Sequence, residues 1–391
     1  MKRVPLDLYK LIEFGLGGDT WQQFVDHYND KYDELSIDGF EFAPTKINYT
    51  WSQLISSTGA KTLPAYVDPE SPGYEKALRE VQGQTGNIPT QKAFYSLNRV
   101  TVLEKMQLVN QFGNAALTPE MQDVFLGLLD ESTDGLIQGY YNSLINQRMR
   151  IVSTGKFTID VNNNPRGLQG ITLDFGIDSS HFDTLSGTAR WWTDADRTTE
   201  GTAADPIIYM KKRVKYIRKN GHVGVPIHIE ISDALWQDVL VHSAVLKRIG
   251  YLLQPLAKAD SDAVSYAQNL ADDTLKAAIE RIVGVPIVVR DTLAFVDKPN
   301  ATTHELEVVQ VENFNPKNIA FVPDGRIGSI QGVSPLTLGY DADKVATFND
   351  GRLVLTQRAV PETHSIYIES EAAQLCVPSV PQYMYISTVT A

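Results

Sequence analysis

The sequence has little of several features that mark whole classes of protein. Its 391 residues include one cysteine, Cys376. A single cysteine excludes an intramolecular disulfide, a zinc site built from several thiolates and an iron–sulfur cluster, and it predicts folding in the cytoplasm. The N-terminus carries no long apolar stretch, and apolar runs such as 282–289 are far shorter than the roughly 20 residues that cross a bilayer. We therefore expect no signal peptide and no membrane partner.

Positive charge is scarce as well. Lys and Arg number 35 against 47 Asp and Glu, which gives a net charge of −12. An acidic chain is poorly suited to coating nucleic acid, so any contact with DNA should be local and weak. The sequence also lacks an HExxH motif, a Walker loop and a GxSxG motif, and its glycine-rich stretch at 15–18 does not follow a strand.

Few residues offer chemistry. His228 and Glu230 share one face of an expected strand, a spacing that two metal ligands can use, but no third ligand is indicated nearby. Cys376 stands between apolar neighbours, where a buried small hydrophobe is the default. The acidic pairs at 194–196, 260–262 and 341–343 lack the glycine and the final acidic residue of a calcium loop, which favours turns and caps. We expect no catalytic residue, no metal and no cofactor.

The chain is long enough for two or three packed units, since one hydrophobic core stops growing at roughly 250–300 residues. Hydrophobic residues make up 43% and charged residues 21%, the balance of an ordinary folded protein. Residues 1–40 hold two short amphipathic stretches, the second containing Trp21 and Phe24, and predict an arm. Residues 66–89 have hardly any apolar face, so we expect a partner to cover this excursion.

The strongest local pattern begins at Thr118 and Pro119, an N-cap followed by proline at the first helical position. Apolar residues recur from there in steps of three and four, which predicts a helix over about 119–153. Gly127, Gly135 and Gly139 within it predict a bend or a close contact with another helix. Clean alternation over 156–176, broken by a turn, predicts a β-hairpin.

A second unit over about 190–340 mixes helices and strands. Asp205 and Ser232 are expected to cap helices, and Gly284 to end a third. The segments 225–231 and 285–289 read as strands. Further strand candidates lie at 317–323, 327–331, 352–358, 365–369 and 383–389. The expected fold class is α+β, with an α/β core in the second unit.

Six positive charges fall within nine residues near the end of one expected helix: Lys211, Lys212, Arg213, Lys215, Arg218 and Lys219. Cations are favourable at a helix C-terminus, so a solvated face or a face between subunits is the plain interpretation. A phosphate-binding patch is the alternative.

The order of these elements resembles the major capsid proteins of tailed bacteriophages, in particular the lambda-like E family. The local matches include the helix running through 147–157, the tryptophans at 191–192 before 204–207, and the segment 231–236. The stretches 285–289 and 320–328 and the closing strand beyond Pro378 follow in the same order. The matches lie within residues 100–391, and their order carries the resemblance.

The resemblance implies five regions. These are an N-terminal arm (1–40), an extended β excursion called the E-loop (41–100), a peripheral domain with a spine helix and β-hairpin (101–189), an axial α/β domain (190–340), and a return to the peripheral sheet (341–391). Intersubunit contacts are then expected at Trp21 and Phe24 in the arm, and at Lys61, Tyr66, Asp68 and Lys92 in the loop. Some family members cross-link a loop lysine to an asparagine, but nothing identifies such an asparagine for Lys61 or Lys92.

What the resemblance implies about function is mechanical. Subunits are expected to self-assemble into hexamers and pentamers of an icosahedral shell that encloses double-stranded DNA, a non-enzymatic role. Expected partners are further copies of the chain, a scaffolding protein supplied separately, a portal, decoration proteins and weakly held DNA. The expected location is the virion capsid, after assembly in the host cytoplasm.

Three other functions remain open at this point. An encapsulin-like shell shares the fold and holds cargo enzymes. An intracellular α/β enzyme is a further alternative, with a site near His228 and Glu230. A portal or tail subunit would form a ring or a tube.

Overall fold

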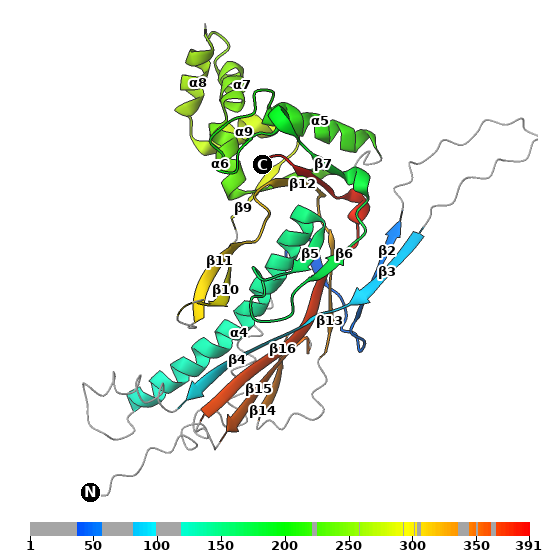
Figure 1. Cartoon of the computed structure of the whole chain (residues 1–391), viewed down its shortest axis with the longest axis vertical. Coiled ribbons are helices and arrows are strands. Elements are labelled where there is room, and N and C mark those ends of the chain that lie inside the picture. Colours follow the sequence, from blue (N-terminus) through cyan, green and yellow to red (C-terminus); the bar gives the residue numbers. More distant parts are fainter. Residues whose placement is uncertain are drawn as a thin grey trace, which may run out of the picture. The chain divides into compact units, whose positions relative to one another are not determined.

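The computed structural model describes residues 37–56, 81–98, 119–220, 225–257, 259–291, 293–300, 302, 306–334, 344–348, 351–360 and 365–391. The chain divides into two compact units, and Figure 1 shows their elements. The first unit draws on the described parts of 37–51, 86–144 and 329–376. The second draws on those of 52–85, 145–328 and 377–391.

The first unit is built on a six-stranded sheet. Its strands lie in the order β1 (Phe40–Phe42), β13 (Gly328–Val333), β16 (Ser365–Pro378), β15 (Leu353–Val360) and β14 (Lys344–Phe348), and β4 (Thr90–Asn98) also pairs with β16. The central strand β16 runs antiparallel to both β15 and β4, so that Ser370 lies opposite Leu355 on one side and Ala93 on the other. The strand candidates at 327–331, 352–358 and 365–369 are confirmed.

The long helix α4 (Pro119–Thr154) is 36 residues long and begins at the predicted proline. Within the first unit, Ile137 is fully buried and Leu144 is nearly so. The side chain of Gln91 on β4 donates to the Ser143 hydroxyl at 2.6 Å. Cys376 is buried beside the Leu144 carbonyl, with its sulfur 3.6 Å away, as expected of a small hydrophobe. The predicted helix over 119–153 is therefore confirmed.

Glycine in α4 allows one close approach. A Cβ added at Gly135 would lie 3.0 Å from the Tyr95 hydroxyl of β4, tighter than most side-chain contacts. The sequence predicts a bend or a close helix contact at these glycines, whereas the neighbour at Gly135 is a strand. Gly139 meets nothing within 4 Å.

The second unit is a five-stranded mixed sheet with helices packed on it. Its strand order is β7 (Phe182–Thr184), β17 (Tyr385–Thr388), β12 (Asn318–Pro323), β8 (Ile227–Ser232) and β9 (Ile287–Arg290). The parallel pair β8 and β9 is joined through α6 (Asp233–Val241), α7 (Ser243–Leu253), α8 (Asp260–Gln268) and α9 (Asp272–Val283). This connection gives the α/β character that the sequence predicts, because parallel neighbours need a long crossover.

The caps of the second unit form as predicted. The Asp205 carboxylate accepts a hydrogen bond from the Ile208 amide at 2.9 Å and starts α5 (Pro206–Lys219). The Ser232 hydroxyl accepts one from the Leu235 amide at 3.2 Å and starts α6. Gly284 ends α9 with a φ of 83°, a left-handed conformation that favours glycine.

The core of the second unit contains large apolar side chains from both the sheet and the helices. Trp191, Ile229 and Ile249 are fully buried, and Trp236 and Phe321 are nearly so. The 3₁₀ helices η1 (Ser179–His181), η2 (Gly187–Ala189) and η4 (Pro381–Tyr383) connect the surrounding strands. Among the described helices, none combines the length and hydropathy that a bilayer span needs.

Three two-stranded ribbons complete the described structure. They are β2 (Thr50–Ser56) with β3 (Val81–Asn87), β5 (Lys156–Ile159) with β6 (Ile171–Asp174), and β10 (Leu293–Pro299) with β11 (Leu306–Glu312). The pair β5–β6 is the predicted hairpin, with Phe157 opposite Leu173. The pair β10–β11 was not predicted, and the alternation in residues 306–312 is broken by the adjacent Val308 and Val309.

The strands after residue 341 do not all join one sheet. β14, β15 and β16 lie in the sheet of the first unit, whereas β17 pairs with β12 and β7 in the second unit. The pairing of β17 is set by its partners, which no local pattern in 383–389 reveals. The division into arm, E-loop, peripheral domain and axial domain stays a prediction.

Candidate functional site

The predicted pair His228 and Glu230 lies in a buried ion cluster on β8. The Glu230 side chain is fully buried and accepts a hydrogen bond from Arg148 on α4 at 2.6 Å. Arg290 on β9 donates to the same carboxylate at 2.8 Å, and the His228 Nε2 lies 3.2 Å from it. The other ring nitrogen of His228 lies 2.5 Å from the Asp324 carboxylate. Two arginines that the sequence analysis did not single out thus complete the cluster.

The electrostatics of the cluster fix its protonation. Burial raises the pKa of the Glu230 carboxyl, but the charge of Arg148 and the hydrogen bonds to the carboxylate outweigh burial and hold the pKa well below its usual range. Burial lowers the pKa of His228, but its hydrogen bonds to Glu230 and Asp324 outweigh burial and raise the pKa above its ordinary value. A carboxylate so firmly ionised and so fully paired is a poor general acid or base.

No metal site accompanies the cluster. Among the described residues, no three His, Cys, Asp or Glu side chains gather to hold an ion. Asp194 accepts hydrogen bonds from the amides of Thr198 and Thr199, at 3.1 and 3.0 Å, which is the turn expected for the first acidic pair. Asp260 stands in the first turn of α8, and 341–343 lie outside the described residues. His228 and Glu230 are held by hydrogen bonds and ion pairs with Arg148, Arg290 and Asp324.

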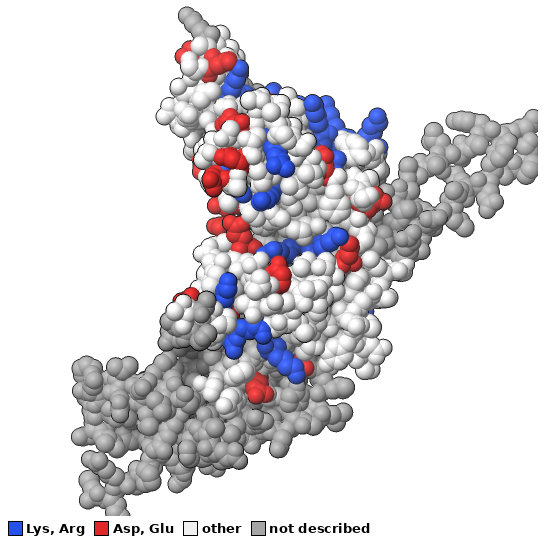
Figure 2. All heavy atoms as spheres, in the orientation of Figure 1, with Lys and Arg blue, Asp and Glu red and all other residues white. Residues whose placement is uncertain are grey.

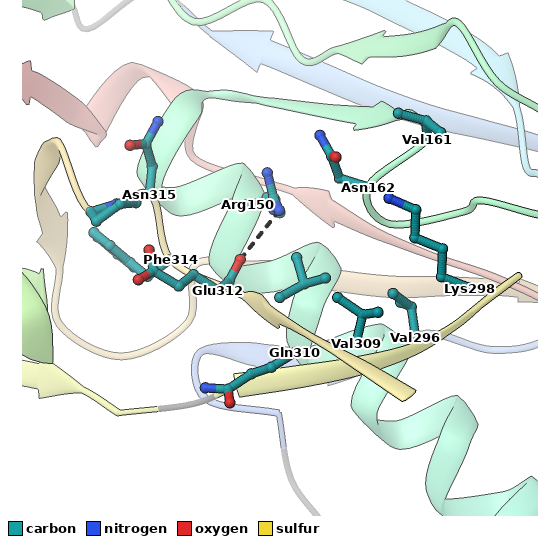
Figure 3. Close-up of a pocket in the computed structure, with 12 residues that line it drawn as sticks. Arg150, Val161, Asn162, Val296, Lys298, Val309, Gln310, Glu312, Phe314 and Asn315 are labelled. Atoms are coloured by element: carbon teal, nitrogen blue, oxygen red, sulfur yellow. Dashed lines mark hydrogen bonds between the residues drawn. The ribbon is translucent and has the colours of Figure 1, made fainter. Parts of the chain in front are cut away.

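A cavity of about 430 Å³ lies between the end of α4, the turn after β5 and the ribbon β10–β11 (Figure 3). Arg150, Asn162 and Lys298 bring polar groups to it from three elements, and Val296, Val309 and Phe314 supply apolar wall. A guanidinium nitrogen of Arg150 donates to the Glu312 carbonyl at 3.2 Å. No local sequence pattern indicates this cavity, because its lining residues are scattered over 150–316.

The ribbon β10–β11 presents one apolar face to solvent. The register places Val308 opposite Asp297 and Leu306 opposite Pro299, which sets four apolar side chains on the face that also holds Asp297, Gln310 and Glu312. The exposed fractions of the four apolar side chains are 43% for Leu293, 64% for Phe295, 54% for Leu306 and 69% for Val308. The opposite face holds Val296, Lys298, Val309 and Val311, which line the cavity. A two-stranded ribbon is marginal on its own, so an uncovered apolar face on one indicates a contact with another molecule.

The predicted basic patch forms a face on α5. Five of its six cations are exposed and recur at helical spacing on the side opposite the buried Met210, Val214 and Ile217. This basic face consists of Lys211, Lys212, Lys215, Arg218 and Lys219. Arg213 is not part of the basic face, because its side chain is half-buried. It donates to the His181 carbonyl at 3.1 Å and lies over the Tyr385 ring.

The predicted intersubunit residues are only partly described. Lys92 lies on β4, mostly exposed, and forms an ion pair at 3.0 Å with Glu371 of β16, its register neighbour. The remaining residues, Trp21, Phe24, Lys61, Tyr66 and Asp68, lie outside the described residues. Their role in assembly stays a prediction.

Comparisons with known proteins give the following likenesses. No protein-family model and no curated protein sequence matches the chain. Among solved structures, the chain is similar to a phage-related protein from Bordetella bronchiseptica, with 14% identity, 89% of each chain covered and a TM-score of 0.46. It is similar to the procapsid of satellite phage P4, with 10% identity, 96% of this chain and 98% of that chain covered and a TM-score of 0.45. It is also similar to the capsid of cyanophage P-SCSP1u, with 10% identity, 90% of this chain and 87% of that chain covered and a TM-score of 0.44.

The similar structures are mostly phage capsids, the class of protein that the sequence resembles. With identities of 9–14% and TM-scores of 0.37–0.46, the likeness by itself assigns neither a family nor a function to this chain.

Proposed function

We propose that this chain is the subunit of an icosahedral phage capsid shell. In this role it assembles into hexamers and pentamers and encloses double-stranded DNA. The observation that carries the proposal is the apolar face of β10–β11, where Leu293, Phe295, Leu306 and Val308 are all at least 43% exposed. Neighbouring copies would remove this face from water, as repeated contacts in a closed shell do.

Two further features support an assembling protein. The described chain contains three separate two-stranded ribbons, and such ribbons gain stability mainly by packing on other surfaces. The one polar cluster predicted as an enzyme site is fully paired around the buried Glu230. The proposal extends to a scaffolding protein, a portal and decoration proteins as partners, to weak contact with DNA, and to assembly in the host cytoplasm.

Negative-stain microscopy combined with light scattering tests the proposal. The purified protein is examined alone and after co-expression with a candidate scaffold. Closed polyhedral particles or capsomer-sized rings are the expected result, because the exposed apolar faces must be covered. A stable monomer or dimer under every condition contradicts the proposal and returns attention to the surroundings of His228 and Glu230.

The contents of such particles separate the two kinds of shell. Particles formed in the presence of the packaging machinery are expected to hold duplex DNA that resists nuclease. Particles that instead retain a specific enzyme, with no protected DNA, support the encapsulin-like alternative. An open ring or tube as the only product supports a portal or tail subunit.

A further inference from the structure

The second unit carries positive charge on one edge and negative charge on another. Figure 2 shows blue side chains over α5 and red side chains along the other edge of the same unit, over α8 and the neighbouring helices. The acidic edge is defined here by the exposed carboxylates in the first turns of α8 and α9: Asp260, Asp262, Asp272 and Asp273. Among them, Asp260 is paired with Lys247.

Helix α9 separates Arg218 of the basic face from two carboxylates of the acidic edge. Arg218 of the basic face donates to the carbonyl of Gly284, directly after the end of α9, at 3.3 Å. Asp272 and Asp273 stand at the start of the same helix, which is 12 residues long. A rise of 1.5 Å per residue makes this about 18 Å of helix. Arg218 and these two carboxylates therefore lie at opposite ends of α9, about one helix length apart.

Local helix physics does not account for the basic face. Cations in the last turn of a helix are favourable, which covers Arg218 and Lys219. Lys211 and Lys212 lie in the middle of α5, where the helix dipole gives them no benefit. Residues 206–219 contain no acidic side chain, and among the described residues the basic face makes no ion pair within 4.0 Å. Lys211, Lys212 and Lys215 are therefore left without a counter-charge among the described residues of a chain with net charge −12, and an external anionic partner would supply one.

We infer that the basic face of α5 binds the acidic edge of α8 and α9 on the next copy of this chain, head to tail around a ring. The inference rests on the proposed shell function and assigns the charged contact within its capsomers. A head-to-tail contact that closes on itself satisfies both surfaces of every subunit at once. Complementary charge also steers subunits into register and rejects wrong orientations. A second copy fits better than DNA because every copy brings a matching acidic edge.

Charge reversal with complementation tests this contact. In the first variant, Lys211→Glu, Lys212→Glu and Lys215→Glu make the basic face acidic. In the second, Asp262→Lys, Asp272→Lys and Asp273→Lys make the acidic edge basic. Each variant alone is expected to give about tenfold fewer capsomer rings than the wild type by native mass spectrometry, because like charges then face each other.

Co-expression of the two variants provides the decisive measurement. An alternating ring places every reversed face against an opposite charge, so hexamers are expected to return, whereas pentamers cannot alternate and should stay absent. The control variant Arg166→Glu/Lys317→Glu/Arg326→Glu carries the same charge change at other exposed sites of the unit, outside the ribbon β10–β11. It is expected to form rings as the wild type does. Circular dichroism and thermal unfolding check that each variant folds.

The remaining outcomes overturn the inference in distinguishable ways. Normal rings from both single variants show that shell assembly stands without this contact. Normal rings with reduced DNA retention in the first variant alone assign the basic face to DNA. Folded single variants that lose rings but are not restored together also contradict the contact. No rings or shells from the wild type contradict the proposed function itself.

Discussion

Glu230 shows how far a single residue can depend on partners that are distant in sequence. Its carboxylate is fully buried between Arg148, which is 82 residues away, and Arg290, which is 60 residues away. Removing water from an ion costs several kcal/mol, so the carboxylate is stable there only because both guanidinium groups remain beside it. The two arginines depend on the carboxylate in the same way.

The change Glu230→Gln is expected to destabilise the protein by about 3–5 kcal/mol, because it leaves two largely buried guanidinium groups without a counter-charge. Urea unfolding followed by circular dichroism measures the loss. The control Asp196→Asn removes the same charge from an exposed side chain and should change stability by less than about 0.5 kcal/mol. Equal effects from the two changes would show that the cluster contributes no stability.

His228 gives the cluster a dependence on pH. Its folded-state pKa is raised by Glu230 and Asp324, so the protonated ring stabilises the folded state. This contribution is fully present below the unfolded pKa of about 6.5 and is lost as pH rises through the higher folded pKa. The stability difference between the wild type and His228→Gln should therefore shrink as pH rises above about 6.5. Urea unfolding over a pH series measures it.

Two other histidines also make stability depend on pH, so the effect of His228 has to be measured as the difference in stability between the wild type and His228→Gln. Burial lowers the pKa of both His181 and His242. The contribution of each to the stability of the folded protein is therefore lost as pH falls through the ordinary histidine range. Their contribution is common to the wild type and to His228→Gln and cancels in the comparison. A difference that grows as pH rises would contradict the role assigned to His228.

At the scale of elements, the sequence was sufficient to predict a helix start or end wherever residues next to that boundary determine it. Proline at position 119 starts α4, Asp205 and Ser232 cap α5 and α6, and Gly284 ends α9, all as predicted. The ribbon β10–β11 was missed, because its exposed valines and phenylalanine do not alternate with polar residues on a solvent side. A surface made for contact disturbs the pattern that usually identifies a strand.

The double change Phe295→Ser and Val308→Thr tests the apolar face of that ribbon. Both side chains are more than 60% exposed, so the unassembled subunit should keep its stability within about 0.5 kcal/mol. Assembly should weaken by about 2 kcal/mol per contact, because less apolar area leaves water. Light scattering measures shell formation and thermal unfolding measures subunit stability.

The change Leu168→Ser is the matched control, since this leucine is 66% exposed in the turn between β5 and β6. It removes a similar apolar side chain without touching the β10–β11 face. Shells that form equally well from the double variant and from the control would remove the observation on which the proposed function rests.

At the scale of the whole molecule, the separation of charge in unit two matters more than the net charge of −12. Net charge describes solubility and long-range repulsion. Five cations lie on α5 and carboxylates lie at the starts of α8 and α9, so the unit has one basic and one acidic surface. Two such different surfaces allow head-to-tail contacts around a ring, whereas a uniformly acidic surface would only repel other copies.

Salt is expected to slow capsomer formation. Between about 0.1 M and about 1 M sodium chloride the Debye length falls from about 10 Å to about 3 Å, which screens the attraction between the basic face and the acidic edge. Stopped-flow light scattering measures the initial rate. The variant with three reversed lysines should show a rate that salt raises, because salt screens its repulsion. A wild-type rate that does not fall with salt would leave burial of apolar surface as the main driving force.

The sequence by itself determined the elements whose causes are local. The helix over 119–153, the hairpin after it, the caps of the second unit, the α+β class and the buried state of Cys376 follow from periodicity, turn residues and side-chain chemistry within a few residues. Only the tertiary structure decided which surfaces are paired and which are left open. The arginines around Glu230, the sheet that β17 joins, the apolar face of β10–β11 and the separation of charge between α5 and α8–α9 all depend on residues far apart in the chain. Their positions are set by packing, and packing is not encoded in any single window of sequence.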